Sequence, residues 1–126
     1  MMQFYTLLIP TILIAASAQI FFKKGVLALG TLDFSLLGFF SLIPKVIQNA
    51  WLISGMFLFG ISFLLYLFVL SKIQLNIIYP VVVGSGIILV TLASWSIFKE
   101  HLSMTQFIGI SIIIFGIFLI MQKNTI

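Results

Sequence analysis

The chain has 126 residues, of which 63% are hydrophobic and only 6% are charged. A soluble domain carries about 25% charged residues, so this composition excludes one and indicates a membrane protein. The chain has no cysteine, and one histidine with two acidic residues is too few to build a metal centre. We therefore expect no metal, no cofactor and no enzymatic activity.

The formal net charge of +4 comes from six lysines and no arginine, placed singly or as one pair. A surface that follows a nucleic-acid backbone needs a basic patch, so we expect no nucleic-acid partner. The lysines are interpreted as anchors at the surface of a lipid bilayer.

Four stretches are apolar enough to cross a bilayer, which takes about 20 residues in a helix. They cover residues 3–22, 50–70, 77–98 and 105–121. The joints between the last three are only a few residues long, which is typical of antiparallel neighbours in a bundle. The predicted fold is an all-α integral membrane protein, with a single four-helix transmembrane domain over residues 1–126.

The first span carries Gln19, followed one helical turn later by Lys23, on the same face as Thr11 and Ala15. A lysine at the end of a span either anchors the helix or binds an anion such as a phosphate, and this applies to Lys24 as well. An amide in hydrocarbon needs partners, which a neighbouring helix or a substrate can supply. Gln19, Lys23 and Lys24 are candidate substrate-binding residues.

Residues 33–49 form too long a connection for a tight turn. Polar or small residues recur there every three or four positions among apolar ones, which predicts a short amphipathic helix at the membrane interface. We expect Asp33 to be its N-cap and Pro44 to break or kink it. The segment either covers the bundle as a widened loop or helps to admit a lipid.

The second and third spans add three polar side chains to the candidate site. Ser62 and Tyr66 are four residues apart and share a helix face, and Tyr79 lies near the start of the third span. With Gln19 and a lysine they would form a polar track for a head group. Tyr79 could instead belong to an aromatic belt.

Two pairs of glycines complete the pattern. Gly84 and Gly86 lie near the middle of the third span and predict a hinge, with close helix packing as the alternative. Gly109 and Gly116 give the fourth span a face of small residues, which predicts a dimer interface.

These motifs resemble those of the small multidrug resistance transporters. That family has a tyrosine and a Gly-x-Gly kink in its third helix, like Tyr79, Gly84 and Gly86, and a Ser-Phe pair in its second helix, like Ser62-Phe63. Glycines of its dimerising fourth helix correspond to the pair predicted above. The resemblance covers roughly residues 50–122. It implies a transporter that works as a pair of four-helix chains.

The resemblance fails at the acidic residue on which drug export depends. Those exporters carry a membrane-embedded glutamate in the first helix, and alignment on Lys23 places Ala15 at that position. Val82 stands where the exporters have a tryptophan. A buried carboxylate can exchange a proton for a cation and alanine cannot, so proton-coupled cation export is not expected.

Ser-Ala-Gln before Lys23, and the Leu-Asn-Ile-Ile-Tyr-Pro run ending at Pro80, resemble the glutamate-free branch formed by subunits of the aminoarabinose-phosphoundecaprenol flippase. This resemblance implies a flippase for a polyprenyl-phosphate-linked sugar in the bacterial inner membrane. Its partner would be a second copy or a related four-helix chain. Two alternatives stay open: a small-solute or drug transporter, and a non-transporting membrane subunit of a glycosyltransferase system.

Overall fold

A computed structural model describes residues 2–122. These residues form the helices α1 (Met2–Leu29), α2 (Leu36–Gln48), α3 (Ala50–Leu70), α4 (Leu75–Ile97) and α5 (Met104–Gln122). Four of them, α1, α3, α4 and α5, are long and apolar enough to cross a membrane. The predicted all-α architecture, with a shorter apolar helix between the first two spans, is confirmed.

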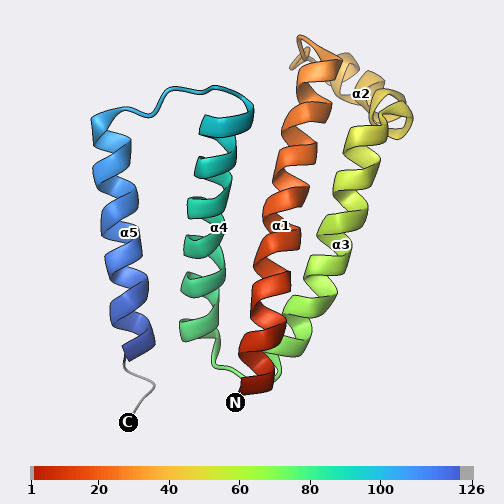
Figure 1. Cartoon of the computed structure of the whole chain (residues 1–126). Helices are drawn as coiled ribbons and strands as arrows, with labels where there is room; N and C mark the ends of the chain where they lie inside the picture. Colours follow the sequence, from red (N-terminus) through yellow and green to blue (C-terminus); the bar gives the residue numbers. More distant parts are fainter. Residues whose placement is uncertain (1, 123–126) are drawn as a thin grey trace.

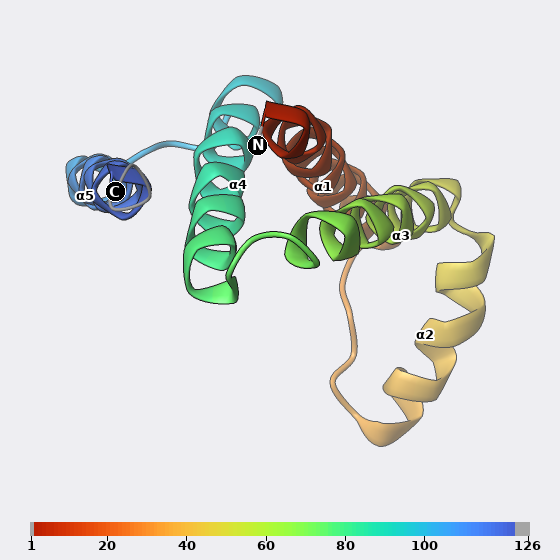
Figure 2. The same cartoon turned by 90° about the horizontal axis from the view of Figure 1, so that it is seen from below.

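The four long helices stand side by side, with α4 between α5 and α1 and with α3 on the other side of α1 (Figures 1 and 2). The contact between α1 and α3 is the most extensive, followed by those of α4 with α1 and with α5. None of the described residues of α5 is buried. The arrangement is therefore an open row of helices rather than a closed bundle.

A small core lies where α1, α3 and α4 meet. Its buried side chains are Leu8, Ile12, Val69, Ile78 and Val81. Ser62 of α3 donates its buried hydroxyl to the backbone carbonyl of Thr11 in α1 at 3.0 Å, and the Thr11 hydroxyl donates to the Leu7 carbonyl at 2.7 Å. Because an unpaired hydroxyl is costly in an apolar interior, these bonds help to fix α3 against α1.

Glycine allows α1 and α3 to approach closely along the half of the pair nearest α2. A Cβ added at Gly25 would lie 2.5 Å from the Leu52 side chain, and one added at Gly55 would lie 2.8 Å from the Phe22 ring. At the end of this contact the Asn49 side chain accepts hydrogen bonds from the first turn of α3 and donates one to the Gly25 carbonyl at 3.0 Å. The pair is thus close-packed and tied at its end.

The first helix is longer than predicted. It continues through the two lysines to Leu29, and Gly30 follows with a φ of 75°, a backbone conformation that suits glycine at a helix C-terminus. The lysines therefore lie on helical turns, and their positions around the helix decide what each of them meets.

The prediction for the connector over residues 33–49 is wrong about its N-cap and about a break at Pro44. Ser35 caps α2, because its hydroxyl accepts the Gly38 N–H at 3.0 Å, whereas Asp33 accepts hydrogen bonds from the backbone and hydroxyl of Ser35. Pro44 does not break the helix, which runs on to Gln48. Since none of the residues of α2 is buried, water or lipid head groups can satisfy the carbonyl that loses its partner to proline.

The helix α2 projects from one end of the row, where it contacts α3 (Figure 2). Its apolar side chains and those just before it are exposed, with Phe34 98% and Leu37 82% accessible. Such a helix suits the boundary between head groups and acyl chains, which is the position that its sequence predicts.

Replacing Gly55 with alanine should lower the free energy of unfolding by about 1–3 kcal/mol, the usual cost of overpacking a tight contact. The new methyl group would press on the Phe22 ring and lie 3.2 Å from Phe21 Cβ. Gly60 lies on the same helix with nothing within 4 Å of its Cβ position, so Gly60→Ala is the matched control. Unfolding in mixed micelles titrated with SDS measures both variants. Equal stabilities would contradict the close approach of α1 and α3.

Candidate functional site

Two adjoining cavities lie between α1 and α4. One, of about 410 Å³, is lined by Ala15, Ala16, Gln19, Val82, Val83, Gly86, Ile87, Val90 and Thr91. The other, of about 330 Å³, is lined by Gln19, Ile20, Phe22, Lys23, Val26, Val90, Ser94, Phe98 and Glu100. Gln19 and Val90 line both, so the cavities form one continuous α1–α4 groove. The groove runs from the middle of the two helices to the end of the row where α2 lies.

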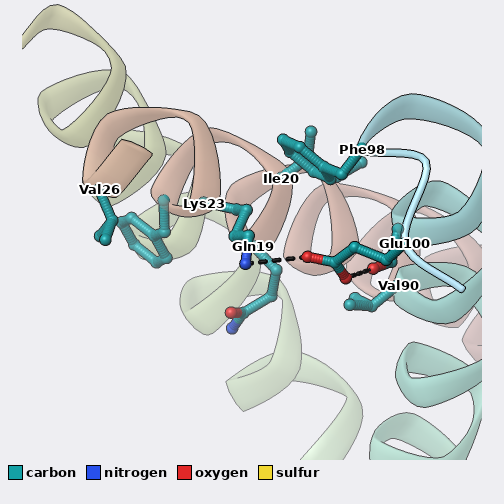
Figure 3. A pocket seen from close by; sticks show the side chains of 9 residues that line it. Gln19, Ile20, Lys23, Val26, Val90, Phe98 and Glu100 are labelled. Carbon is teal, nitrogen blue, oxygen red and sulfur yellow. Dashed lines mark hydrogen bonds and ion pairs between the residues drawn. The ribbon is translucent and has the colours of Figure 1, made fainter. Parts of the chain in front are cut away.

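An ion pair marks the end of the α1–α4 groove that lies nearest α2. The Lys23 Nζ of α1 is 2.9 Å from Glu100 Oε1, in the turn after α4, and both side chains are 47% exposed (Figure 3). The other carboxylate oxygen of Glu100 accepts the Ser94 hydroxyl, and the Glu100 backbone N–H donates to the Ser94 carbonyl at 3.3 Å. Lys99, with a φ of 56°, lets the chain fold back in this way. The turn after α4 therefore places the Glu100 carboxylate beside α1.

The surroundings of Glu100 favour its charged form. Its pKa is lowered from the ordinary value of 4.5, first by the hydrogen bond from Ser94 and then by the hydrogen bond and charge of Lys23. The remaining lining of this cavity is mostly apolar, from Ile20 and Phe22 to Phe98. The groove is therefore amphipathic, with apolar walls and one charged end.

The two adjacent lysines, Lys23 and Lys24, point towards different neighbours of α1. Lys23 lines the α1–α4 groove together with Gln19, as Figure 3 shows. Lys24 points to the other neighbour of α1, where its ammonium nitrogen lies 4.8 Å from the ring centroid of Trp51 in α3. This cation–π contact gives Lys24 a packing role.

The other predicted polar residues do not line the groove. Ser62 is buried against α1, where it bonds to a backbone carbonyl, and Tyr66 packs against the small core. Tyr79 is 57% exposed near the start of α4. In this arrangement of one chain, the structure brings Gln19 and Lys23 together but places these three side chains outside the two cavities.

The two glycine pairs lie in different surroundings. A Cβ at Gly84 would overlap the Ile117 side chain of α5, so this glycine allows α4 and α5 to pack, whereas Gly86 lines the groove. Nothing lies within 4 Å of a Cβ at Gly109 or Gly116. The small-residue face of α5 is thus uncovered within the described part of the chain.

Glu100 is the residue at this site that sequence reasoning missed. A charge in a short turn after a span is usually solvated, so the sequence gives it no special weight. The available signal is that Glu100 is the only glutamate of the chain and follows Ser94 closely, but its pairing with Lys23 depends on the packing of α4 beside α1.

A titration can test the cause of the lowered pKa of Glu100. Because this pKa lies below the unfolded value of 4.5, the stabilising effect of the carboxylate is present above that value and lost as the pH falls through the folded-state pKa. Glutamate labelled with ¹³C at the carboxyl gives a single NMR signal. Its midpoint should rise in Ser94→Ala and rise less in Lys23→Met, in the order of the two causes. A midpoint unchanged by Ser94→Ala would contradict the proposed hydrogen bond.

Comparison with known proteins identifies the family of this chain. The sequence model of the Small Multidrug Resistance protein family matches residues 39–113, more than half of the chain. The chain is 30% identical over 81 residues to the probable 4-amino-4-deoxy-L-arabinose-phosphoundecaprenol flippase subunit ArnE of Pseudomonas syringae, a match that covers 64% of this chain and 72% of that protein. The same subunit of Pseudomonas fluorescens is 26% identical over 74 residues, with 59% and 64% covered.

A third relative is named for a different role. The quaternary ammonium compound-resistance protein QacH of Staphylococcus saprophyticus is 42% identical over 64 residues, which cover 48% of this chain and 60% of that protein. The chain spans about three-fifths of the length of the first curated relatives it matches. No solved structure matches at a significant level. On the family match and its four apolar helices, this chain is a multi-pass membrane protein that belongs to the Small Multidrug Resistance family.

Proposed function

We propose that this chain is a subunit of a flippase in the bacterial inner membrane, and that it translocates a polyprenyl-phosphate-linked sugar or a related anionic lipid. The observation that carries this proposal is the amphipathic α1–α4 groove, with a lysine at one end and apolar walls beyond it. An amphiphile with a charged head group and a hydrocarbon tail has the same distribution of polarity. The similarity to proteins named as flippase subunits supports the same substrate class.

In this proposal the phosphate is held by Lys23, and Gln19 offers the next polar contact deeper in the groove. A phosphate that crosses hydrocarbon without such donors would lose several kcal/mol at least. The polyprenyl tail stays in the bilayer beside the apolar part of the groove. Because α2 lies at the same end as Lys23 and exposes its apolar side chains, it is suited to admit the lipid from the interface.

Beyond Gln19, the head group would pass Ser62, Tyr66 and Tyr79. These side chains do not line the groove, so the crossing requires α1 and α4 to rearrange, for which Gly86 in the groove wall is the proposed hinge. Gly84 would contribute only if the contact with Ile117 loosens.

The groove wall also supports a mechanism without proton exchange. Ala15 and Val82 both line it, and they stand where the drug exporters have a glutamate and a tryptophan. The lipid would then move down its own gradient, drawn by its consumption on the far side. Similarity to QacH favours drug or cation transport as the second candidate, but the groove of this chain offers no buried carboxylate to such a cation.

A single chain forms an open row, so we propose that two chains complete the transport path. The partner is a second copy or a related four-helix chain. Gly109 and Gly116, on the uncovered face of α5, would allow a second helix to approach closely.

Reconstitution into liposomes tests the substrate and its binding residue. Lys23→Ala should slow translocation of a fluorescent polyprenyl phosphate by roughly tenfold or more, because it removes a charge-assisted hydrogen bond to the phosphate. Lys24→Ala, which removes the same charge from the face that meets Trp51, should slow it less than Lys23→Ala does. Equal rates in Lys23→Ala and the wild type would exclude this binding mode. Proton-driven cation flux without lipid translocation would favour the drug transporter.

Assembly is tested by a steric substitution on α5. Gly116→Leu should abolish the crosslinked dimer in membranes while the monomer still inserts, because the added side chain keeps the partner helix away. Gly60→Leu on α3 is the control, since a Cβ there also meets nothing within 4 Å. A dimer that survives Gly116→Leu but not Gly60→Leu would move the interface to α3.

A further inference from the structure

We propose that Lys23 and Glu100 together form a paired-charge site for a head group that carries both a phosphate and an ammonium group. In this site Lys23 takes the phosphate and Glu100 takes the ammonium, so that Glu100 is the residue that determines specificity. The inference rests on the proposed function and deepens it. The names of the flippase relatives already include an amino sugar and a phosphate, so the new element is the residue that would select the ammonium group.

The first argument is electrostatic. With Lys23 Nζ and Glu100 Oε1 only 2.9 Å apart, the two charged side chains that line this end of the groove offset each other. A head group with a phosphate alone would gain the lysine but would also lie beside the carboxylate and be repelled by it. A head group with both charges exchanges one ion pair within the protein for two ion pairs with the ligand.

The second argument is that Glu100 is held independently of Lys23. Its carboxylate accepts the Ser94 hydroxyl, and its backbone N–H donates to the Ser94 carbonyl. When Lys23 turns towards a phosphate, Glu100 therefore stays at the groove, where it keeps its hydrogen bond from Ser94 but loses its ion-pair partner. An ammonium group on the ligand is the complement that restores the pairing.

The third argument is that the ion pair contributes little as a structural lock and has space around it. Both side chains are 47% exposed, and exposed ion pairs usually stabilise a fold only slightly. Glu100 also lines a further cavity of about 300 Å³, together with Trp95, Ser96, Lys99 and His101. Uncharged parts of the head group can extend into this space while the ammonium stays at Glu100 and the phosphate stays in the groove.

Three short probes separate the charges: farnesyl phosphate, its 2-aminoethyl ester and its 2-hydroxyethyl ester. The two esters differ in the ammonium group alone. Binding to the purified protein in detergent, measured by calorimetry, should favour the aminoethyl ester over the hydroxyethyl ester by roughly tenfold, the usual scale of a charge-assisted contact. Equal affinity of the wild-type protein for both esters would overturn the proposal.

The variants assign this preference to one carboxylate. Glu100→Gln should remove the preference while it keeps or improves binding of farnesyl phosphate, and Ser94→Ala should reduce the preference. Asp33→Asn is the matched control, because it removes the other acidic residue of the chain, which lies just before α2. A preference that survives in Glu100→Gln would show that the ammonium binds elsewhere and would contradict the proposal.

Bulk phospholipid and polyprenyl lipid can offer the same two charges, and competition distinguishes them. If dioctanoyl phosphatidylethanolamine displaces the aminoethyl probe at equal concentration and dioctanoyl phosphatidylglycerol does not, the paired-charge site is supported and its ligand is a bulk phospholipid. If neither competes, the probe's polyprenyl chain is also recognised, and the site is supported with a polyprenyl ligand. Because these assays measure binding, a protein that shows the preference but translocates no lipid contradicts only the proposed function.

Discussion

Close packing between α1 and α3 determines what the opposite face of α1 can do. On one side of α1, Gly25, Gly55 and the Ser62 hydrogen bond allow a tight, fully paired contact. On the other side, Ala15 and Gln19 face α4 across a groove that side chains do not fill. Since the bilayer supplies no hydrophobic force between helices, steric fit determines on which side of α1 the neighbouring helix packs closely. A helix held firmly on one side can leave a cavity on the other.

The distribution of charge follows the same division. Within the spans the groove is lined mostly by apolar side chains, and its ion pair lies at the end nearest α2. Both side chains of the pair are 47% exposed, so they can keep contact with water, whereas a carboxylate at Ala15 would lie midway along an apolar helix. Under the proposed function, the charged head group would be held at the membrane surface. The two acidic residues of the chain, Asp33 and Glu100, both lie outside the four long helices.

The sequence was sufficient to predict the four spans, because runs of about 20 apolar residues have few other uses. It was also sufficient to place Gln19 and Lys23 on one face, since their spacing is one helical turn. It could not predict that Ser62 faces α1 or that Gly84 faces α5. Helices that are apolar on every side carry no periodic signal to show which side meets a neighbour. The pairing of Lys23 with Glu100 could not be predicted for a related reason, because it depends on how α4 packs beside α1.

The central claim is that the α1–α4 groove receives the substrate lipid, and photocrosslinking tests it most directly. A photoreactive amino acid at Ile87, in the groove wall, is compared with one at Phe57, which is 71% exposed on α3. The account predicts that a polyprenyl phosphate is captured at Ile87 and that excess unlabelled polyprenyl phosphate suppresses this capture, whereas capture at Phe57 is weak and does not saturate. Equal, non-saturating capture at both positions would show that the groove meets only bulk lipid and would contradict the account.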